Sequence, residues 1–237
     1  MYGMKNTARI LLTAPVGKKT WTFDDDMPYG RVVSDAVIQP NGKILIFNGA
    51  RRGQTGGQIA KPLMFGAAND VFCYDPKAPA GKRFKVFAFS PYRRYYHSTA
   101  ALLPNGNSIV MGTDEATNVV GPTAYNHRGE LFIPPWLLDG TPRPIIVSVP
   151  TGVIAFKSQF VITFTGTVTG VSFVTPGSGS HGTEMSQRLL FPIIVSKTAN
   201  SITVTAPADA TVMLQGFHML YLLNGDTPSV AAWVKFG

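Results

Sequence analysis

The sequence predicts an all-β protein: part of a β-propeller followed by an immunoglobulin-like β-sandwich. Two hairpin-like segments repeat each other in the first half, and short apolar runs separated by turn residues fill the second half. No window shows sustained helical periodicity. The 24 glycines and 18 prolines agree with this prediction, because such a composition is typical of many turns between short strands.

The repeat predicts propeller blades. "AVIQPNGKILIFNG" (residues 36–49) aligns with "AALLPNGNSIVMG" (residues 100–112), and each holds Pro-Asn-Gly between two apolar runs. Asn-Gly between β-prone runs is a strong hairpin signal. "VFCYDPKAPAGKRFKVFAF" supplies two more strands, and four strands per repeated unit is typical of a blade. The excess length, "RRGQTGGQIAKPLMFGAAN", predicts an inserted loop at the rim.

A proline-rich segment, "PPWLLDGTPRPIIVSVP", predicts a linker between two domains. We place the incomplete propeller in residues 1–138 and the sandwich in residues 139–237, with roughly seven strands in runs such as "QFVITFTGTV", "RLLFPIIV" and "SVAAWVKF". Two clear blades are fewer than the four to eight that close a propeller. We therefore expect the C-terminal portion of a longer protein, or a ring completed by assembly.

Composition excludes several partners. The net charge of +8 invites a nucleic-acid hypothesis, but lysine and arginine are scattered, and neither a basic helix nor zinc-finger spacing occurs. Acidic polysaccharide or a cell wall is the better candidate for such a charge, with a solvated surface as the plain alternative. No apolar stretch approaches the ~20 residues of a membrane helix, and the N-terminal segment lacks a signal peptide pattern.

One cysteine, Cys73, excludes an intrachain disulfide and predicts an inert buried thiol.

The stretch "RRYYHS" raises the possibility of a metal site. Neighbouring side chains on a strand point to opposite faces, so Tyr96 and His97 can share a ligand only where the backbone bends. A half-buried strand of alternating polarity is the plain alternative. His181, in the Gly/Ser-rich loop "TPGSGSHGTEMSQR", is a candidate partner from the second domain. Two imidazoles and a phenolate in tetragonal geometry favour Cu(II).

These motifs resemble the galactose oxidase and glyoxal oxidase family of copper radical oxidases. "RYYHS" followed by "ALLPNG" resembles the family's copper-ligand motif, and "GSGSHGTEMSQR" resembles the loop with its second copper histidine. Three further segments are similar, so that the resemblance covers most of residues 24–236. They are "MPYGRVVSDAVIQPNGKILIFNGARRG", "ELFIPPWL…RPIIVSVP" and "GFHMLYLLNGDTPSVAAWV".

The resemblance implies the last blades of a kelch-like, seven-bladed propeller and an early-set immunoglobulin-like domain. It implies that His97 and His181 are equatorial ligands of one copper ion, and that Tyr96 is the axial, catalytic tyrosine that accepts the substrate's proton. The implied reaction oxidises a small alcohol, aldehyde or carbohydrate while O2 becomes H2O2. The family also implies an extracellular full-length parent, although this chain shows no signal peptide.

The chain departs from the family in its redox cofactor. The family joins a second, equatorial tyrosine to a cysteine by a thioether, and Cys73 does not match that cysteine. We therefore expect that the chain does not encode the tyrosyl radical and is a truncated, possibly inactive oxidase. The alternatives are a non-catalytic carbohydrate- or cell-wall-binding module and an inactive truncated gene product.

Other candidates carry weaker predictions. Arg51, Arg52 and Gln54 could line the mouth of the site and bind substrate, with a solvated loop as the alternative. His218 is predicted to pack in the interior and His127 to lie in a surface loop. Trp136 and Trp233 are predicted to be core residues.

Overall fold

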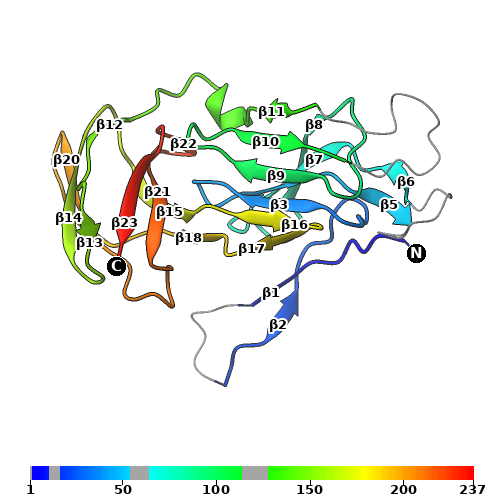
Figure 1. Ribbon diagram of the computed structural model, residues 1–237, viewed down its shortest axis with the longest axis horizontal. Coiled ribbons are helices and arrows are strands. Elements are labelled where there is room, and N and C mark those ends of the chain that lie inside the picture. Colours follow the sequence, from blue (N-terminus) through cyan, green and yellow to red (C-terminus); the bar gives the residue numbers. More distant parts are fainter. Residues whose placement is uncertain (1, 11–16, 54–63, 114–127) are drawn as a thin grey trace.

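The computed structural model describes residues 2–10, 17–53, 64–113 and 128–237, and these form an all-β protein, as predicted (Figure 1). Within these ranges the one helical element is a single 3-10 turn, η1 (Pro135–Leu137). No helix in the described part of the chain is long and apolar enough to cross a membrane. Gln54 and His127 lie outside the described residues.

The first repeat unit forms a four-stranded antiparallel blade in the order β3-β4-β7-β8. The Pro-Asn-Gly turn joins its first two strands, and Gly42 has a φ of 90° there, which glycine adopts without steric cost. The predicted insertion leaves the blade after β4 and forms a separate hairpin, β5-β6. The bounds are β3 (Asp35–Ile38), β4 (Ile44–Phe47), β5 (Ala50–Gly53), β6 (Met64–Ala67), β7 (Asp70–Tyr74) and β8 (Phe84–Phe89).

The second repeat unit follows the same plan, with three strands among the described residues in the order β11-β10-β9. A two-stranded hairpin, β1-β2, precedes the first blade, and its Trp21 and Phe23 are 71% and 85% exposed. The structure therefore shows part of a β-propeller. The bounds are β1 (Ala8–Ile10), β2 (Trp21–Phe23), β9 (Thr99–Leu102), β10 (Ser108–Met111) and β11 (Glu130–Phe132).

A buried arginine braces each blade. Arg31 donates hydrogen bonds to the carbonyl oxygens of Asn48 (3.0 Å), Ala68 (3.1 Å) and Asp70. In the second blade, Arg94 donates to the carbonyl oxygens of Gly112 and Arg128, both at 2.9 Å. Both arginines end a Pro-Tyr-x-Arg sequence, "PYGR" (28–31) and "PYRR" (91–94), so the repeat begins earlier than its hairpins suggested.

The C-terminal part is a sandwich of two sheets, with strand orders β12-β14-β20-β19 and β13-β23-β21-β15-β18; β22 pairs with β21. Side chains of β14 alternate between solvent and core, as expected for a strand with one buried face. The bounds are β12 (Ile145–Ser148), β13 (Val153–Ile154), β14 (Gln159–Thr165), β15 (Gly170–Thr175), β18 (Arg188–Leu190), β19 (Ile194–Lys197), β20 (Ser201–Thr205), β21 (Gly216–Asn224), β22 (Thr227–Pro228) and β23 (Ala232–Phe236).

The apolar run "RLLFPIIV" does not form one strand. It divides into β18 and β19, which belong to opposite sheets, with Pro192 between them. Proline has no N–H to donate to a ladder, so it separates the two pairings. The division between residues 138 and 139 stays a prediction; the two parts touch closely there, since Thr227 Oγ1 donates to the Trp136 carbonyl at 2.8 Å.

The structure gives the burial of four residues that the sequence places in the interior. Cys73 is buried in the first blade, and burial raises the pKa of its thiol to about 12, as fits an inert thiol. His218 is buried as predicted, and its Nε2 lies 2.7 Å from the Leu214 carbonyl oxygen. Trp136 lies in the core, but the prediction for Trp233 was wrong, because it is 48% exposed on β23.

Both Pro-Asn-Gly turns lie against the sandwich. In the first, Asn41 Nδ2 donates to the carbonyl oxygen of Asp226 at 3.2 Å. In the second, the Pro104 carbonyl accepts from Ala231 N at 2.8 Å, and Tyr221 donates its hydroxyl to Leu103 at 3.1 Å. One end of each blade is therefore fixed to the C-terminal domain.

A narrow hairpin reaches from the sandwich toward the opposite end of the blades (Figure 1). It consists of β16 (Ser178–Ser180) and β17 (Thr183–Met185), and His181 lies at its tip. β16 packs against β9 and β17 against β3, so the hairpin touches the edge strands of both blades. Below it, Gln187 Oε1 accepts a hydrogen bond of 2.8 Å from Ile38 N.

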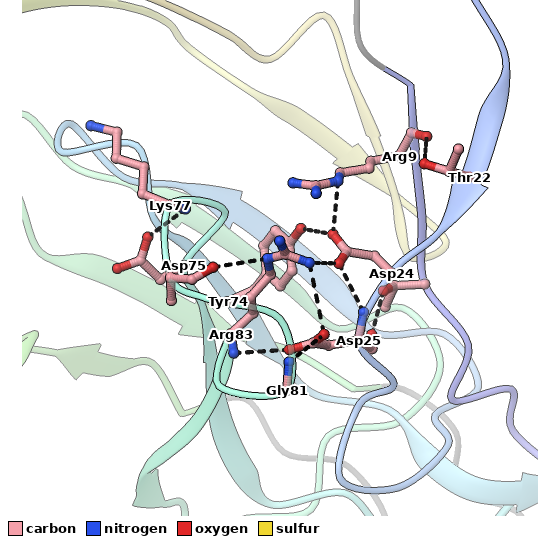
Figure 2. Close-up of polar contacts among 11 residues, drawn as sticks. Arg9, Thr22, Asp24, Asp25, Tyr74, Asp75, Lys77, Gly81 and Arg83 are labelled. Carbon is pink, nitrogen blue, oxygen red and sulfur yellow. Dashed lines mark hydrogen bonds and ion pairs between the residues drawn. The ribbon is translucent and has the colours of Figure 1, made fainter.

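A polar cluster ties the first hairpin to the first blade (Figure 2). Asp24 accepts hydrogen bonds from Tyr74 and Arg83 and lies 3.3 Å from Arg9 Nε. Asp25 accepts from the backbone N–H groups of Gly81 (2.8 Å) and Arg83 (3.0 Å). Burial alone would raise the pKa of Asp24, but the Tyr74 hydrogen bond and the nearby cations outweigh burial and lower it.

We expect Asp24→Asn to lower the urea midpoint at pH 7, because the cluster loses its central anion. The stabilisation belongs to the ionised carboxylate, so the wild type loses it as the pH falls below the ordinary carboxyl value of about 4. The gap between wild type and variant should close in acid, as urea titrations over pH 3 to 7 can show. Asp26→Asn, at an exposed carboxylate 3.1 Å from Lys5, is the matched control and should change little. A gap that stays constant with pH would contradict this account.

Candidate copper site

Three aromatic rings from two domains meet where the β16-β17 hairpin reaches the second blade. The Nε2 atoms of His97 and His181 lie 2.9 Å apart. The ring of Tyr96 stacks on His97 with 3.9 Å between centroids, and 5.2 Å separates it from the ring of His181. The structure therefore brings together the three residues that the sequence singled out.

The backbone bends at both histidines. His97 has a φ of 58° and His181 a φ of 56°, in the left-handed region that residues other than glycine rarely adopt. This bend lets Tyr96 and His97 turn their rings to the same side, which a regular strand forbids. The alternative of a half-buried strand across "RRYYHS" is wrong, because β9 begins only at Thr99.

The bend at His97 has a counterpart in the first blade. Val33 precedes Pro40 by seven residues, as His97 precedes Pro104, and Val33 has a φ of 54°. A β-branched residue with positive φ is a genuine outlier. The repeat thus carries a left-handed residue at one position in both blades, with an imidazole in one and a valine in the other.

Two glycines permit the close approaches around the histidines. A Cβ on Gly112 would lie 2.8 Å from the carbonyl oxygen of His97. A Cβ on Gly182, at the tip of the hairpin, would lie 3.0 Å from Cα and Cγ1 of Val33. The hairpin tip therefore rests directly on the bent residue of the first blade while His181 faces the bent residue of the second.

Hydrogen bonds orient part of the cluster. Ser180 Oγ lies 2.8 Å from His181 Nδ1, which leaves Nε2 directed at His97. The backbone of Tyr96 is held by Thr113, whose Oγ1 donates to its carbonyl oxygen at 3.0 Å. His97 and His181 are exposed and Tyr96 is half-buried, so the cluster is open to small molecules.

The donor set fits a copper ion. Metal–imidazole bonds measure about 2.0–2.1 Å, so two of them at a right angle, as in a tetragonal Cu(II) site, place the nitrogens about 2.8–3.0 Å apart. The observed 2.9 Å agrees with that spacing. Among the described residues no group of three or more His, Cys, Asp and Glu side chains is placed to hold a metal. The ring of Tyr96 stacks on His97, which makes its phenol the candidate third donor.

The predicted substrate-binding arginines occupy β5. Arg51 lies over the ring of Tyr29, with 4.0 Å from its Cζ to the centroid, and Arg52 lies 5.5 Å from the centroid of Phe65. Both side chains are exposed. Gln54 falls outside the described residues.

Comparison with known protein families accounts for this geometry. A model described as the glyoxal oxidase N-terminus matches residues 1–135, and one described as the galactose oxidase-like early set domain matches residues 143–236. The chain belongs to the glyoxal oxidase and galactose oxidase family. Its members are copper radical oxidases, as the sequence motifs indicated.

Individual relatives are longer than this chain. It is similar to the aldehyde oxidase GLOX1 of Arabidopsis thaliana, with 32% identity over 99% of this chain and 40% of the relative. It is also similar to the aldehyde oxidase GLOX of Vitis pseudoreticulata, with 31% identity over 96% of this chain and 45% of the relative. The chain thus spans less than half of these curated relatives.

A solved structure shows the same fold. It is a fungal alcohol oxidase of the AA5 family in complex with copper, and it covers 100% of this chain and 49% of its own length with a TM-score of 0.84. Sequence identity to it is 23%. The likeness therefore supports the architecture, the partial propeller with its sandwich.

We expect Gly182→Ala to move His181 away from His97, because the new Cβ would press on Val33. Gly140→Ala is the matched control, since Gly140 also has a left-handed φ (82°) but open space around it. Both variants place a Cβ on a left-handed residue, at about 1–2 kcal/mol, and only Gly182→Ala adds the clash. NMR contacts between the two imidazole rings should weaken in Gly182→Ala alone, with a larger loss of urea midpoint. Equal effects of both substitutions would contradict the close seating of the hairpin.

Proposed function

We propose that the chain supplies the copper-ligand part of a copper radical oxidase site. His97 and His181 would hold one copper ion through their imidazole nitrogens, and Tyr96 would be the catalytic tyrosine. The observation that carries the proposal is the 2.9 Å separation of two imidazole nitrogens that come from different domains, beside a stacked phenol.

The reaction that this site fits is the two-electron oxidation of a primary alcohol or aldehyde. The substrate loses two electrons and two protons, and O2 takes them up to give H2O2. A bound Cu(II) supplies a Lewis acid and a one-electron acceptor. Tyr96 would be held as phenolate by the metal and would accept the substrate's proton.

The second oxidising equivalent requires a group that we place outside this chain. In the family it is a tyrosine joined by a thioether to a cysteine. Cys73 is buried between strands of the first blade, and burial raises the pKa of its thiol to about 12, so it offers no reactive thiolate. On this proposal the chain alone binds copper and completes no turnover.

The substrate class follows from the relatives and the open site. Two similar proteins are named aldehyde oxidases, which favours a small aldehyde or its alcohol over a large carbohydrate. Arg51 and Arg52 remain weak candidates for substrate contact, because both already pack on aromatic rings. An extracellular location for the full-length parent is part of the same proposal.

Copper titration followed by electron paramagnetic resonance tests the ligand set. We expect the wild-type chain to bind one equivalent of Cu(II) with hyperfine splitting from two nitrogens. His181→Ala and His97→Ala should each remove one nitrogen and weaken binding at least tenfold, since each ligand contributes more than the ~1.4 kcal/mol that a factor of ten represents. Tyr96→Phe should alter the spectrum, while Tyr92→Phe, its matched control, should not.

Two outcomes would overturn this proposal. One is a Cu(II) spectrum unchanged by His181→Ala. The other is glycan retention that survives chelation and His97→Ala, which would favour the non-catalytic carbohydrate- or wall-binding module.

Peroxide assays test the division of the redox centre. The copper-loaded chain should produce no H2O2 from simple aldehydes or alcohols, because it lacks the group for the second electron. Fusion to the upstream propeller blades of a similar aldehyde oxidase should restore peroxide production, and the same fusion with Tyr96→Phe should not. Peroxide from the chain alone would place the second redox group within it.

A further inference from the structure

Two carboxyl groups lie where the hairpin that carries His181 packs against the first blade, since β17 lies against β3. Asp35, at the start of β3 in the first blade, is 1% exposed. Glu184, on β17, lies with its carboxyl group against the backbone of Gly177 and Gly179, where any larger residue would collide with it. Glu184 Oε2 is buried and has no hydrogen-bond partner among the described residues. Its carboxyl group lies within the hairpin, on the strand that packs against β3 of the blade.

The surroundings of this pair contain no balancing cation among the described residues. β3 contributes Asp35, whose Oδ2 accepts from Asn48 Nδ2 at 2.6 Å. β9 contributes the uncharged Thr99, near Gly179. The hairpin itself contributes His181, three residues from Glu184 at the tip, and Gln187 follows at its base.

A buried carboxylate oxygen without a donor or cation favours the protonated acid. Burial, and then the charge of Asp35, raise the pKa of Glu184 to about 7. Burial raises the pKa of Asp35 to about 6, against the Asn48 hydrogen bond. The contact between hairpin and blade is thus compatible with one or both groups being neutral and is opposed by two negative charges.

We propose that Glu184 is a positioning residue for His181, holding the β16-β17 hairpin against the first blade in its protonated form and loosening it when ionised. The consequence for copper binding rests on the proposed function of His181, whereas the behaviour of the hairpin does not.

The sign of the pH dependence follows from the raised pKa values. A group that binds its proton more tightly in the closed state stabilises that state at low pH and stops doing so as the pH rises through its folded pKa. The hairpin should therefore loosen progressively between the ordinary carboxyl pKa of about 4 and the folded pKa of Glu184, about 7. Copper binding to imidazoles releases protons and strengthens as the pH rises, so the two effects on copper affinity oppose each other and variants must separate them.

Glu184→Gln is the informative variant, because its amide is an uncharged isostere of the protonated acid at every pH. In the copper-free protein, amide exchange protection factors of residues 178–185 should fall from pH 4 to pH 7 in the wild type and stay high in Glu184→Gln. Asp35→Asn should shift the wild-type transition to lower pH, because it removes the charge that raises the pKa of Glu184. Asp139→Asn, at an exposed carboxyl group, is the control and should match the wild type.

Copper affinity provides the second measurement. The advantage of Glu184→Gln over the wild type in Cu(II) affinity should grow by up to about tenfold per pH unit below the folded pKa of about 7 and stay constant above it. Hairpin protection with the same pH dependence in the wild type, Glu184→Gln and Asp35→Asn would overturn the proposal. PH-dependent protection without any copper binding would instead support the role of Glu184 and overturn the proposed copper site.

Discussion

The candidate site depends on one constraint: two imidazoles from different domains must reach each other, and both do so through left-handed backbone. His97 ends the segment that leads into the second blade, and His181 ends a hairpin that begins in the sandwich. Neither position is occupied by glycine, so each conformation costs free energy that the surrounding contacts must supply. Thr113 and Gly112 hold the first turn, and the seating of Gly182 on Val33 holds the second.

The buried charges divide into two kinds. Arg31 and Arg94 satisfy carbonyl oxygens within their blades and brace them, so their charges serve the fold. Asp35 and Glu184 lie where the hairpin packs against the first blade, and no ion pair to either occurs in the described part of the chain. The two arginines therefore stabilise the blades at every pH at which they are charged. The carboxyl groups, on the proposal above, stabilise the hairpin only while they are protonated.

Much of the architecture could be predicted from the sequence because short stretches of residues determine the turns and strands. Asn-Gly turns fixed both blade hairpins, and alternation of apolar residues located strands such as β14. The sequence did not predict the division of "RLLFPIIV" between two sheets. A single proline within an apolar run indicates a break in pairing but not which sheet each part joins. Trp233 was misjudged because a strand of a sandwich buries only one of its faces.

The site was partly predictable for a different reason. The side-chain types of three residues, Tyr96, His97 and His181, are themselves candidate metal ligands, and the motifs around them indicated one family. The approach of Glu184 to the blade that carries Asp35 left no such trace, because only the path of the hairpin places β17 against β3. The Pro-Tyr-x-Arg sequences are a visible signal of the two buried arginines, and they lie upstream of the repeated hairpins.

The shared bend of Val33 and His97 has a consequence for how such a centre arises. Both blades carry a left-handed residue at the same position of the repeat, and His97 is the residue at that position in the second blade. On the proposed function, a metal ligand at this position requires a change of side chain and no change of backbone conformation. A repeated blade thus contains the same bent backbone position more than once, and Val33 occupies that position in the first blade.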